Sequence, residues 1–176
     1  GIYPTPVVGA LGLLPCVSRR TQIGFKEVGD IVVLVGRGSL ESDAKDLSGS
    51  EYLERIHGVV SGRPNIDLDL EVSVQRACRN LIAKGVLNSA HDCSDGGLFV
   101  ALAESCIAGN IGAFIDLSLP SRWDVTLFGE GQSRIVISLP PRSLDTLADV
   151  CRAEGAPWLQ LGAVGGETLS VGILGQ

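Results

Sequence analysis

The chain has 176 residues, 45% of them hydrophobic, and its 14 Lys and Arg against 20 Asp and Glu give a formal charge of -6. This length and apolar content suit one domain with a single core, and an acidic chain without a basic stripe is a poor match for nucleic acid or an anionic membrane surface. The apolar runs are far shorter than the roughly twenty residues that span a bilayer, and no signal-peptide pattern opens the chain. We therefore expect one soluble, cytoplasmic domain over residues 1–176.

The first half of the chain predicts two strands and two helices. Residues 7–14 form an apolar run broken by two glycines, and residues 31–35 (IVVLV) are continuously apolar, as in a strand covered on both faces. Residues 50–57 predict a short helix with Ser50 as its N-cap. Residues 68–86 have the apolar spacing of the longest helix. The stretches between them are expected to be connections and loops: residues 19–29, 37–49 and 61–65.

The second half predicts short strands that alternate with two more helices, at residues 97–108 and 143–154. The last two strands are expected to pair around Gly165 and Gly166. Because the alternation shows no strict βαβ repetition, we expect an α+β (mixed α/β) fold, with a mixed β-sheet flanked by three to four helices. The expected strands of this half are residues 113–117, 134–139, 159–164 and 168–173, and residues 88–94 are expected to form a short strand and a turn.

The five cysteines and the first residues bear on the kind of protein. The cysteines are odd in number, scattered and free of C-x-x-C spacing, which argues against a disulfide framework and a zinc site. The chain contains no Met and begins at Gly1 in what looks like the approach to a strand. We expect it to be a fragment of a longer protein.

The sequence HDCSDGGL leaves a strand, turns through two glycines and opens a helix. Such a turn offers free backbone N–H groups at the positive end of a helix dipole, which suits a phosphate at Ser94, Gly96 and Gly97. Asp92 and Asp95 supply oxygen ligands of the kind that Mg²⁺ favours. The alternative is that Asp95 only caps the helix and the glycines only let it approach a neighbouring strand.

His91 and Cys93 in the same turn are weaker candidates for chemistry. His91 has no second histidine at ligand spacing, so we expect a partly buried, hydrogen-bonded side chain rather than a metal ligand. A nucleophile made from Cys93 and His91 lacks the third group that would orient it. We therefore assign no catalytic residue to this chain.

Two further loops have polar groups at suitable positions. In FGEGQSR, Glu130 and Gln132 alternate with glycines, so both side chains are able to point into one cleft; the alternative is an ordinary turn with Glu130 and Arg134 exposed. The loop SGSE precedes a helix and offers a second anion nest. Its candidate residues are Ser48, Gly49 and Ser50.

Taken together and in this order, four segments resemble the AIR-synthase-related C-terminal domain of a superfamily of ATP-using enzymes. The segments are YPTPVVG, SGSEYL, SAHDCSDGGL and FGEGQSR. They are most similar to the second half of the synthetase subunit of the small-form phosphoribosylformylglycinamidine synthases, and the resemblance runs essentially end to end. It implies an ATP-dependent ligase of purine biosynthesis that uses Mg²⁺ to convert formylglycinamide ribonucleotide and glutamine-derived ammonia to formylglycinamidine ribonucleotide.

The resemblance also implies partners and site roles. The implied cofactors are ATP or ADP and Mg²⁺, and the implied partners are the remaining domains of the chain, a glutaminase subunit, a small accessory subunit and the ribonucleotide. In the first-half copy the aspartate of the turn binds Mg²⁺ and a Glu-Ser-Gln stretch contacts the ribonucleotide; the matching residues here are Asp92, Glu130, Gly131 and Gln132. Gly131 lacks the serine hydroxyl, which favours an auxiliary nucleotide or phosphate site in a domain that is inactive when isolated.

Two other interpretations stay open at the level of sequence. One is a purely structural interaction domain, in which the glycine loops serve packing and the cleft is empty. The other is the C-terminal domain of a different superfamily member, of the aminoimidazole ribonucleotide synthetase or selenophosphate synthetase type. Those enzymes need an N-terminal ATP-binding domain with its own glycine and acidic motifs.

Overall fold

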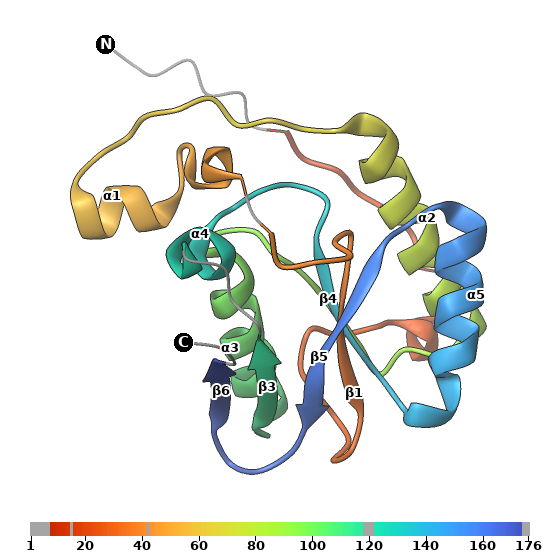
Figure 1. Cartoon of the computed structure of the whole chain (residues 1–176). Coiled ribbons are helices and arrows are strands. Elements are labelled where there is room, and N and C mark those ends of the chain that lie inside the picture. Colours follow the sequence, from red (N-terminus) through yellow and green to blue (C-terminus); the bar gives the residue numbers. More distant parts are fainter. Residues whose placement is uncertain (1–7, 15, 42, 118–121, 174–176) are drawn as a thin grey trace.

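One six-stranded mixed β-sheet forms the centre of the molecule, with helices on both of its faces (Figure 1). The computed structural model describes residues 8–14, 16–41, 43–117 and 122–173. The strand order is β2-β4-β1-β5-β3-β6, and every neighbouring pair is antiparallel except β3 and β6. This confirms the expected fold class. The strands are β1 (Ile31–Val35), β2 (Ser89–Asp92), β3 (Ala113–Leu117), β4 (Ile135–Leu139), β5 (Trp158–Val164) and β6 (Leu169–Ile173).

The described residues form five α-helices, where the sequence predicted three to four. They are α1 (Glu51–His57), α2 (Leu68–Lys84), α3 (Gly97–Gly109), α4 (Trp123–Phe128) and α5 (Leu144–Glu154). The helix that the sequence did not predict is α4, which has six residues and no side-chain cap at its start. Three 3₁₀ turns complete the described elements: η1 (Val17–Arg19), η2 (Ala44–Leu47) and η3 (Pro141–Ser143).

The central strand β1 is covered on both faces, as its continuous apolar sequence predicts. Val32 and Leu34 pack into one apolar cluster with α3, whereas Val33 and Val35 pack into another with α2 and α5. All four side chains are at most 1% exposed. In Figure 1, α2 and α5 lie together on one side of the sheet and α3 on the other. The domain therefore has two apolar layers that share one sheet.

Local capping signals set the helix boundaries. The hydroxyl of Ser50 accepts from the amide of Leu53 at 3.3 Å, which confirms the predicted N-cap of α1. Helix α2 ends at Lys84, two residues before the predicted end. The reason is Gly85, which adopts a left-handed conformation with φ of 68° and donates its amide to Ile82.

The strand expected at residues 7–14 is wrong for residues 8–14, and residue 7 lies outside the described part of the chain. Residues 8–14 have no regular structure, and the side chains of Val8, Leu11 and Leu13 are exposed. An apolar run becomes a strand only where a neighbouring strand accepts its backbone hydrogen bonds, and Gly9 and Gly12 weaken this run further.

The prediction that the last two strands pair with each other is also wrong, although both strands exist. β5 and β6 do not pair with each other, because β3 lies between them, antiparallel to β5 and parallel to β6. Gly162 of β5 makes this close pairing possible, because a Cβ there would overlap the carbonyl oxygen of Phe114. The chain after β5 therefore crosses over β3 to reach the edge of the sheet.

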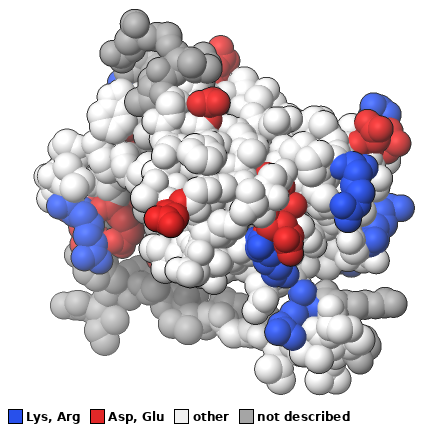
Figure 2. Space-filling model, turned by 90° about the horizontal axis from the view of Figure 1, so that it is seen from below, with Lys and Arg blue, Asp and Glu red and all other residues white. Residues whose placement is uncertain are grey.

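Charged side chains are dispersed over the surface. On the face that Figure 2 shows, Lys and Arg occur in small groups beside Asp and Glu, and a wide area between them carries no charge. Several charged side chains of the domain form local ion pairs, such as Arg152 with Asp149 at 2.8 Å. No described helix is long and apolar enough to cross a membrane.

Candidate functional site

A pocket of about 500 Å³ brings the three predicted loops together. It lies between the start of α2, the turn after β2 and the residues that lead into β4. Seven of the ten predicted site residues line it: Ser48, Gly49, Asp92, Ser94, Asp95, Glu130 and Gln132. The other three do not line the pocket, although Ser50 directly follows Gly49 in the sequence, and Gly96 and Gly97 directly follow Asp95. The ligand roles of all ten stay predictions.

Glu130 links the two helix starts that the sequence proposed as anion nests. One of its carboxylate oxygens, Oε1, accepts from the amide of Glu51 in α1 and from the amide of Gly96, each at 2.8 Å. The amide of Gly97 donates to the carbonyl of Ser94 at 3.0 Å. These amides are therefore already bonded inside the protein, and a phosphate in the pocket would have to find other groups.

Replacing Glu130 with alanine is expected to loosen both helix starts. The loss of two charge-assisted hydrogen bonds should lower the free energy of unfolding by about 2 kcal/mol. It should also speed hydrogen exchange at the amides of Glu51 and Gly96, which hydrogen-exchange NMR measures residue by residue. Glu130→Gln is the matched control, because its amide oxygen can still accept from both amides. Equal exchange rates in the alanine variant and the unmodified protein would show that Glu130 does not hold the helix starts.

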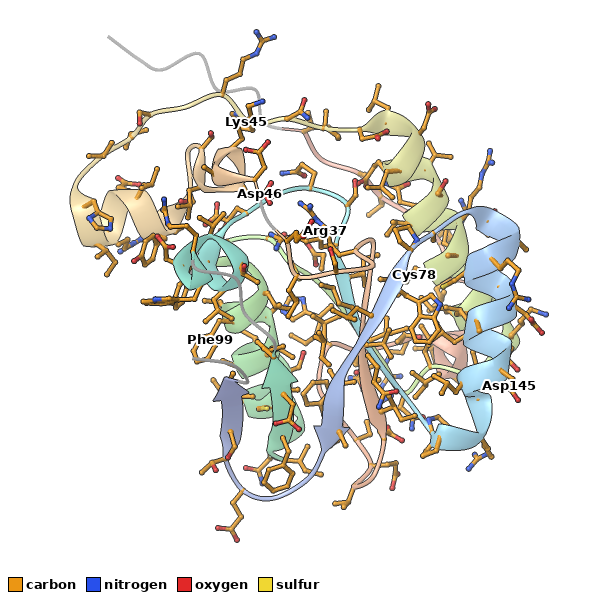
Figure 3. All side chains as sticks on the ribbon, in the orientation of Figure 1. Arg37, Lys45, Asp46, Cys78, Phe99 and Asp145 are labelled. Carbon is orange, nitrogen blue, oxygen red and sulfur yellow. The ribbon has the colours of Figure 1, made fainter. Side chains whose placement is uncertain are left out.

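The glycines on either side of Glu130 allow a close approach to η2. A Cβ on Gly131 would overlap the Asp46 carboxylate, and a Cβ on Gly129 would lie 2.9 Å from the Asp46 Cβ. Asp46 itself pairs with Arg37 at 2.9 Å, and Figure 3 shows these two side chains together near Lys45. Gly131 thus has a packing reason to differ from serine, in addition to lacking the serine hydroxyl.

Arg134 holds the same loop from the inside. Its side chain is buried, and its guanidinium donates to the carbonyl of Gly131 at 2.8 Å and to the carbonyl of Gly129. Burial lowers the pKa of Arg134 from its ordinary value, but a guanidinium stays protonated in proteins. The alternative in which Glu130 and Arg134 are merely exposed charges is therefore wrong for both.

The two glycines of the DGG turn have different tasks. Gly96 and Gly97 both have positive φ, of 79° and 70°. Gly96 is the N-cap of α3, so the alternative in which Asp95 caps this helix is wrong. A Cβ on Gly97 would overlap the carbonyl oxygen of Gly129 and come within 3.0 Å of the Leu127 carbonyl oxygen. The close approach is therefore between α3 and the end of α4, not between a helix and a strand.

Asp92 is held in place by its neighbours. Its Oδ2 accepts from the hydroxyl of Ser94, and its Oδ1 lies 3.5 Å from Nδ1 of His91. The Ser94 hydrogen bond, with smaller contributions from the Asp92 backbone and from His91, holds the pKa of Asp92 below its ordinary value. Asp92 is therefore ionised at neutral pH, as a ligand of a divalent cation must be.

Cys93 has the wrong properties for a nucleophile. Its side chain is buried, and burial raises the pKa of the thiol to about 11. A thiol with this pKa is almost entirely protonated at neutral pH, whereas the thiolate is the reactive form. The structure thus agrees with the absence of a Cys93–His91 nucleophile.

The pocket is acidic. Four carboxylates line it, from Glu71, Asp92, Asp95 and Glu130, against one cation, Arg134, whose guanidinium is bonded to backbone carbonyls. A bare phosphate would be repelled by this charge balance, whereas a divalent cation would be attracted. Among the residues that the structure describes, no three His, Cys, Asp or Glu groups gather as a closed metal site. This donor set fits Mg²⁺, which commonly binds through one or two carboxylates and completes its shell with waters and phosphate oxygens.

Glu71 and Ser133 are among the pocket residues that were not proposed from the sequence. Glu71 lies in the first turn of α2 and accepts from the hydroxyl of Ser133 at 2.6 Å. Ser133 has a positive φ of 63°, which is uncommon for a residue other than glycine and concentrates at functional sites. No sequence signal marks Glu71, because an acidic residue in the first turn of a helix is ordinary.

Residues 27–174 match the family described as AIR synthase related protein, C-terminal domain. Among curated proteins, the chain is 45% identical over 176 residues to phosphoribosylformylglycinamidine synthase subunit PurL of Moorella thermoacetica, covering 99% of the chain and 23% of that protein. It is 48% identical over 167 residues to the subunit of the same name from Synechococcus sp. (strain JA-2-3B'a(2-13)), covering 93% of the chain and 21% of that protein. The chain thus spans less than a quarter of the length of these relatives.

Solved structures show the same fold at lower identity. The structure described as T. maritima PurL complexed with FGAR is 20% identical and superposes with a TM-score of 0.74, covering 90% of this chain and 28% of that one. Thiamine-monophosphate kinase from Stenotrophomonas maltophilia is 19% identical with a TM-score of 0.57, covering 86% of this chain and 52% of that one. At these identities the likeness establishes the fold alone.

Proposed function

This chain belongs to the AIR synthase related protein, C-terminal domain family, and from that premise we propose that it is one domain of a longer ATP-dependent phosphoribosylformylglycinamidine synthase. The identity of 43–48% to PurL subunits over nearly the whole chain supports this assignment over another superfamily member. The complete enzyme would form formylglycinamidine ribonucleotide in the cytoplasm, with ammonia from a glutaminase subunit and the help of a small accessory subunit. The domain corresponds to the C-terminal domain of the second half.

We propose that the acidic pocket takes the phosphates of an ADP or ATP molecule together with Mg²⁺, as an auxiliary site. The observation that carries this proposal is the gathering of Asp92, Asp95 and the Glu130 loop around one cavity. Bound Mg²⁺ would neutralise the negative charges of the carboxylates and phosphates. Asp92 and Asp95 are the residues that would hold it, since both are exposed to the pocket.

No residue of the pocket is assigned a catalytic role. Cys93 is protonated, Arg134 is committed to backbone carbonyls, and Glu130 is committed to two amides. These groups bind and position rather than transfer protons. The isolated chain is therefore expected not to make product, and turnover of ATP, ribonucleotide and ammonia by the chain alone would contradict this.

Asp92→Asn in the complete synthetase tests the site. Asparagine has nearly the same shape but lacks the charge that attracts Mg²⁺, so the nucleotide that copurifies with the enzyme should fall by about 10- to 100-fold. The measurement is nucleotide content by chromatography after acid release, normalised to protein. Asp149→Asn is the matched control, because the Asp149 side chain is 73% exposed against 70% for Asp92 and lies on α5, away from the pocket.

Unchanged nucleotide content in Asp92→Asn, with a normal melting temperature, would favour the purely structural interpretation of the domain. An equal loss in Asp92→Asn and Asp149→Asn would point to a general effect of surface charge. Only a loss confined to Asp92→Asn supports the auxiliary site.

A further inference from the structure

The connection between α1 and α2, residues 58–67, borders the pocket. It crosses one end of the molecule as an extended segment (Figure 1). Pro64 lines the pocket, and Asn65 lines an adjoining pocket of about 210 Å³. Gln132 and Ser133 line both pockets, so the two share one wall. The α1–α2 connection therefore runs along the mouth of both.

Two contacts hold the α1–α2 connection against the loop that precedes α1. The carbonyl of Ser61 accepts from the amide of Gly49 at 2.9 Å. Gly62, with a φ of 97°, packs so closely against the side chain of Ser48 that a Cβ on Gly62 would overlap it. Ser48 and Gly49 both line the pocket. The backbone of Gly62 is therefore fixed at the edge of the pocket.

Arg63 lies between Gly62, which packs against the pocket wall, and Pro64, which is part of that wall. A residue before proline is restricted to extended backbone conformations, so the backbone of Arg63 has little freedom. Its side chain is exposed, and no hydrogen bond or ion pair links it to another residue in the described part of the chain. Such a side chain is able to move between staggered rotamers without breaking a contact. Arg63 is therefore an uncommitted cation at the mouth of the pocket.

The cations that line the two pockets are committed to other groups. Arg134 donates to two backbone carbonyls. In the adjoining pocket Arg37 lies 2.9 Å from Asp46, and Lys45 lies 3.9 Å from Asp43. Bound Mg²⁺ would occupy some of the phosphate oxygens and leave others without a partner. A guanidinium suits these oxygens, because its fork of N–H groups matches two oxygens of one phosphate.

We infer that Arg63 is a binding residue for the nucleotide phosphates: its guanidinium turns over the mouth of the pocket and donates to phosphate oxygens that Mg²⁺ leaves free. This inference rests on the proposed Mg²⁺–nucleotide site. Because the exposed side chain becomes ordered only once phosphates are in place, loss of the contact should mainly speed the release of the nucleotide.

The test measures how fast the complete synthetase releases ADP. The enzyme is equilibrated with radiolabelled ADP and Mg²⁺, separated from free nucleotide by gel filtration, and diluted into excess unlabelled ADP with Mg²⁺. The label that Asp92→Asn fails to retain identifies the proposed site. Arg63→Ala should release this fraction about tenfold faster, as the loss of one charge-assisted hydrogen bond predicts. Arg63→Lys should restore part of the retention, because an ammonium still binds phosphate as a point charge.

Arg142→Ala is the matched control. Arg142 is also an exposed arginine, but it lies in η3 and does not line the pocket. Its release rate should equal that of the unmodified enzyme. The difference between Arg63→Ala and the unmodified enzyme should shrink at high salt, because an exposed ionic contact is screened. The melting temperature of Arg63→Ala without nucleotide should not change, since the side chain has no partner in the described part of the fold.

Two results would overturn the inference while leaving the site in place. One is an unchanged release rate in Arg63→Ala when Asp92→Asn does lose bound ADP. The other is an equal acceleration in Arg63→Ala and Arg142→Ala, which would reflect the overall charge of the domain. If Asp92→Asn retains as much ADP as the unmodified enzyme, the proposed site itself is wrong, and the role of Arg63 is overturned with it.

Discussion

Gly97→Ala should destabilise the protein by about 3 kcal/mol, because two penalties coincide at this residue. A side chain at a φ of 70° is strained, and the added Cβ would overlap the carbonyl oxygen of Gly129. The overlapping atom is backbone, so it is unable to move aside without displacing the loop that carries Glu130. The free energy of unfolding, from urea denaturation followed by circular dichroism, measures the effect.

Gly155→Ala is the control that separates the two penalties. Gly155 has nearly the same φ, 71°, but a Cβ there meets nothing within 4 Å. Its replacement should cost only the conformational strain, about 1 kcal/mol. Equal losses in the two variants would mean that the close approach of α3 to Gly129 contributes nothing, and the packing explanation of the DGG turn would then fail.

Arg134→Met should also cost about 3 kcal/mol, for a different reason. Methionine fills much of the same space but leaves the carbonyls of Gly129 and Gly131 without their donor, and an unsatisfied buried carbonyl costs about 1–3 kcal/mol. Arg134→Lys should recover less than half of the loss, because a single ammonium lacks the fork that reaches both carbonyls. Urea denaturation again supplies the measurement.

The control for Arg134 is Arg152→Met on α5. The Arg152 side chain is 76% exposed and pairs with Asp149 three residues earlier, so its loss should change stability by less than about 0.5 kcal/mol. Full recovery of stability by Arg134→Lys would indicate that charge alone, and not the two-pronged contact, holds the loop.

Elements with strong local signals were predictable from the sequence. β1 is a continuously apolar run in which every residue except Leu34 is β-branched, whereas Ser50 caps α1 and Gly85 ends α2 through interactions among near neighbours. The sequence did not indicate which strands would be neighbours in the sheet. An alternation of apolar and polar residues indicates that a strand exists but not which strand lies beside it. The position of β3 between β5 and β6 was therefore not predicted.

The candidate site was also predictable from the sequence only in part. The three motifs predicted the residues that meet around the pocket, because such turns between strands and helices expose backbone and polar groups. They did not predict that the Glu130 carboxylate itself would accept from the helix starts of α1 and α3, since this depends on contacts 79 and 34 residues apart in sequence. Glu71 was missed for the same reason, because its link to Ser133 spans 62 residues.

The position of β1 in the sheet constrains how the chain reaches its folded state during synthesis. Ile31 pairs with Leu139 of β4 on one side and with Ala163 of β5 on the other. When β1 leaves the ribosome, neither neighbour has yet been made, so both edges of this continuously apolar strand are open until β4 emerges, and one edge stays open until β5 follows. Contacts between such distant segments form slowly, and open strand edges invite pairing with other chains. Between the synthesis of β1 and that of β5, at least one edge of β1 is therefore available for pairing with other chains.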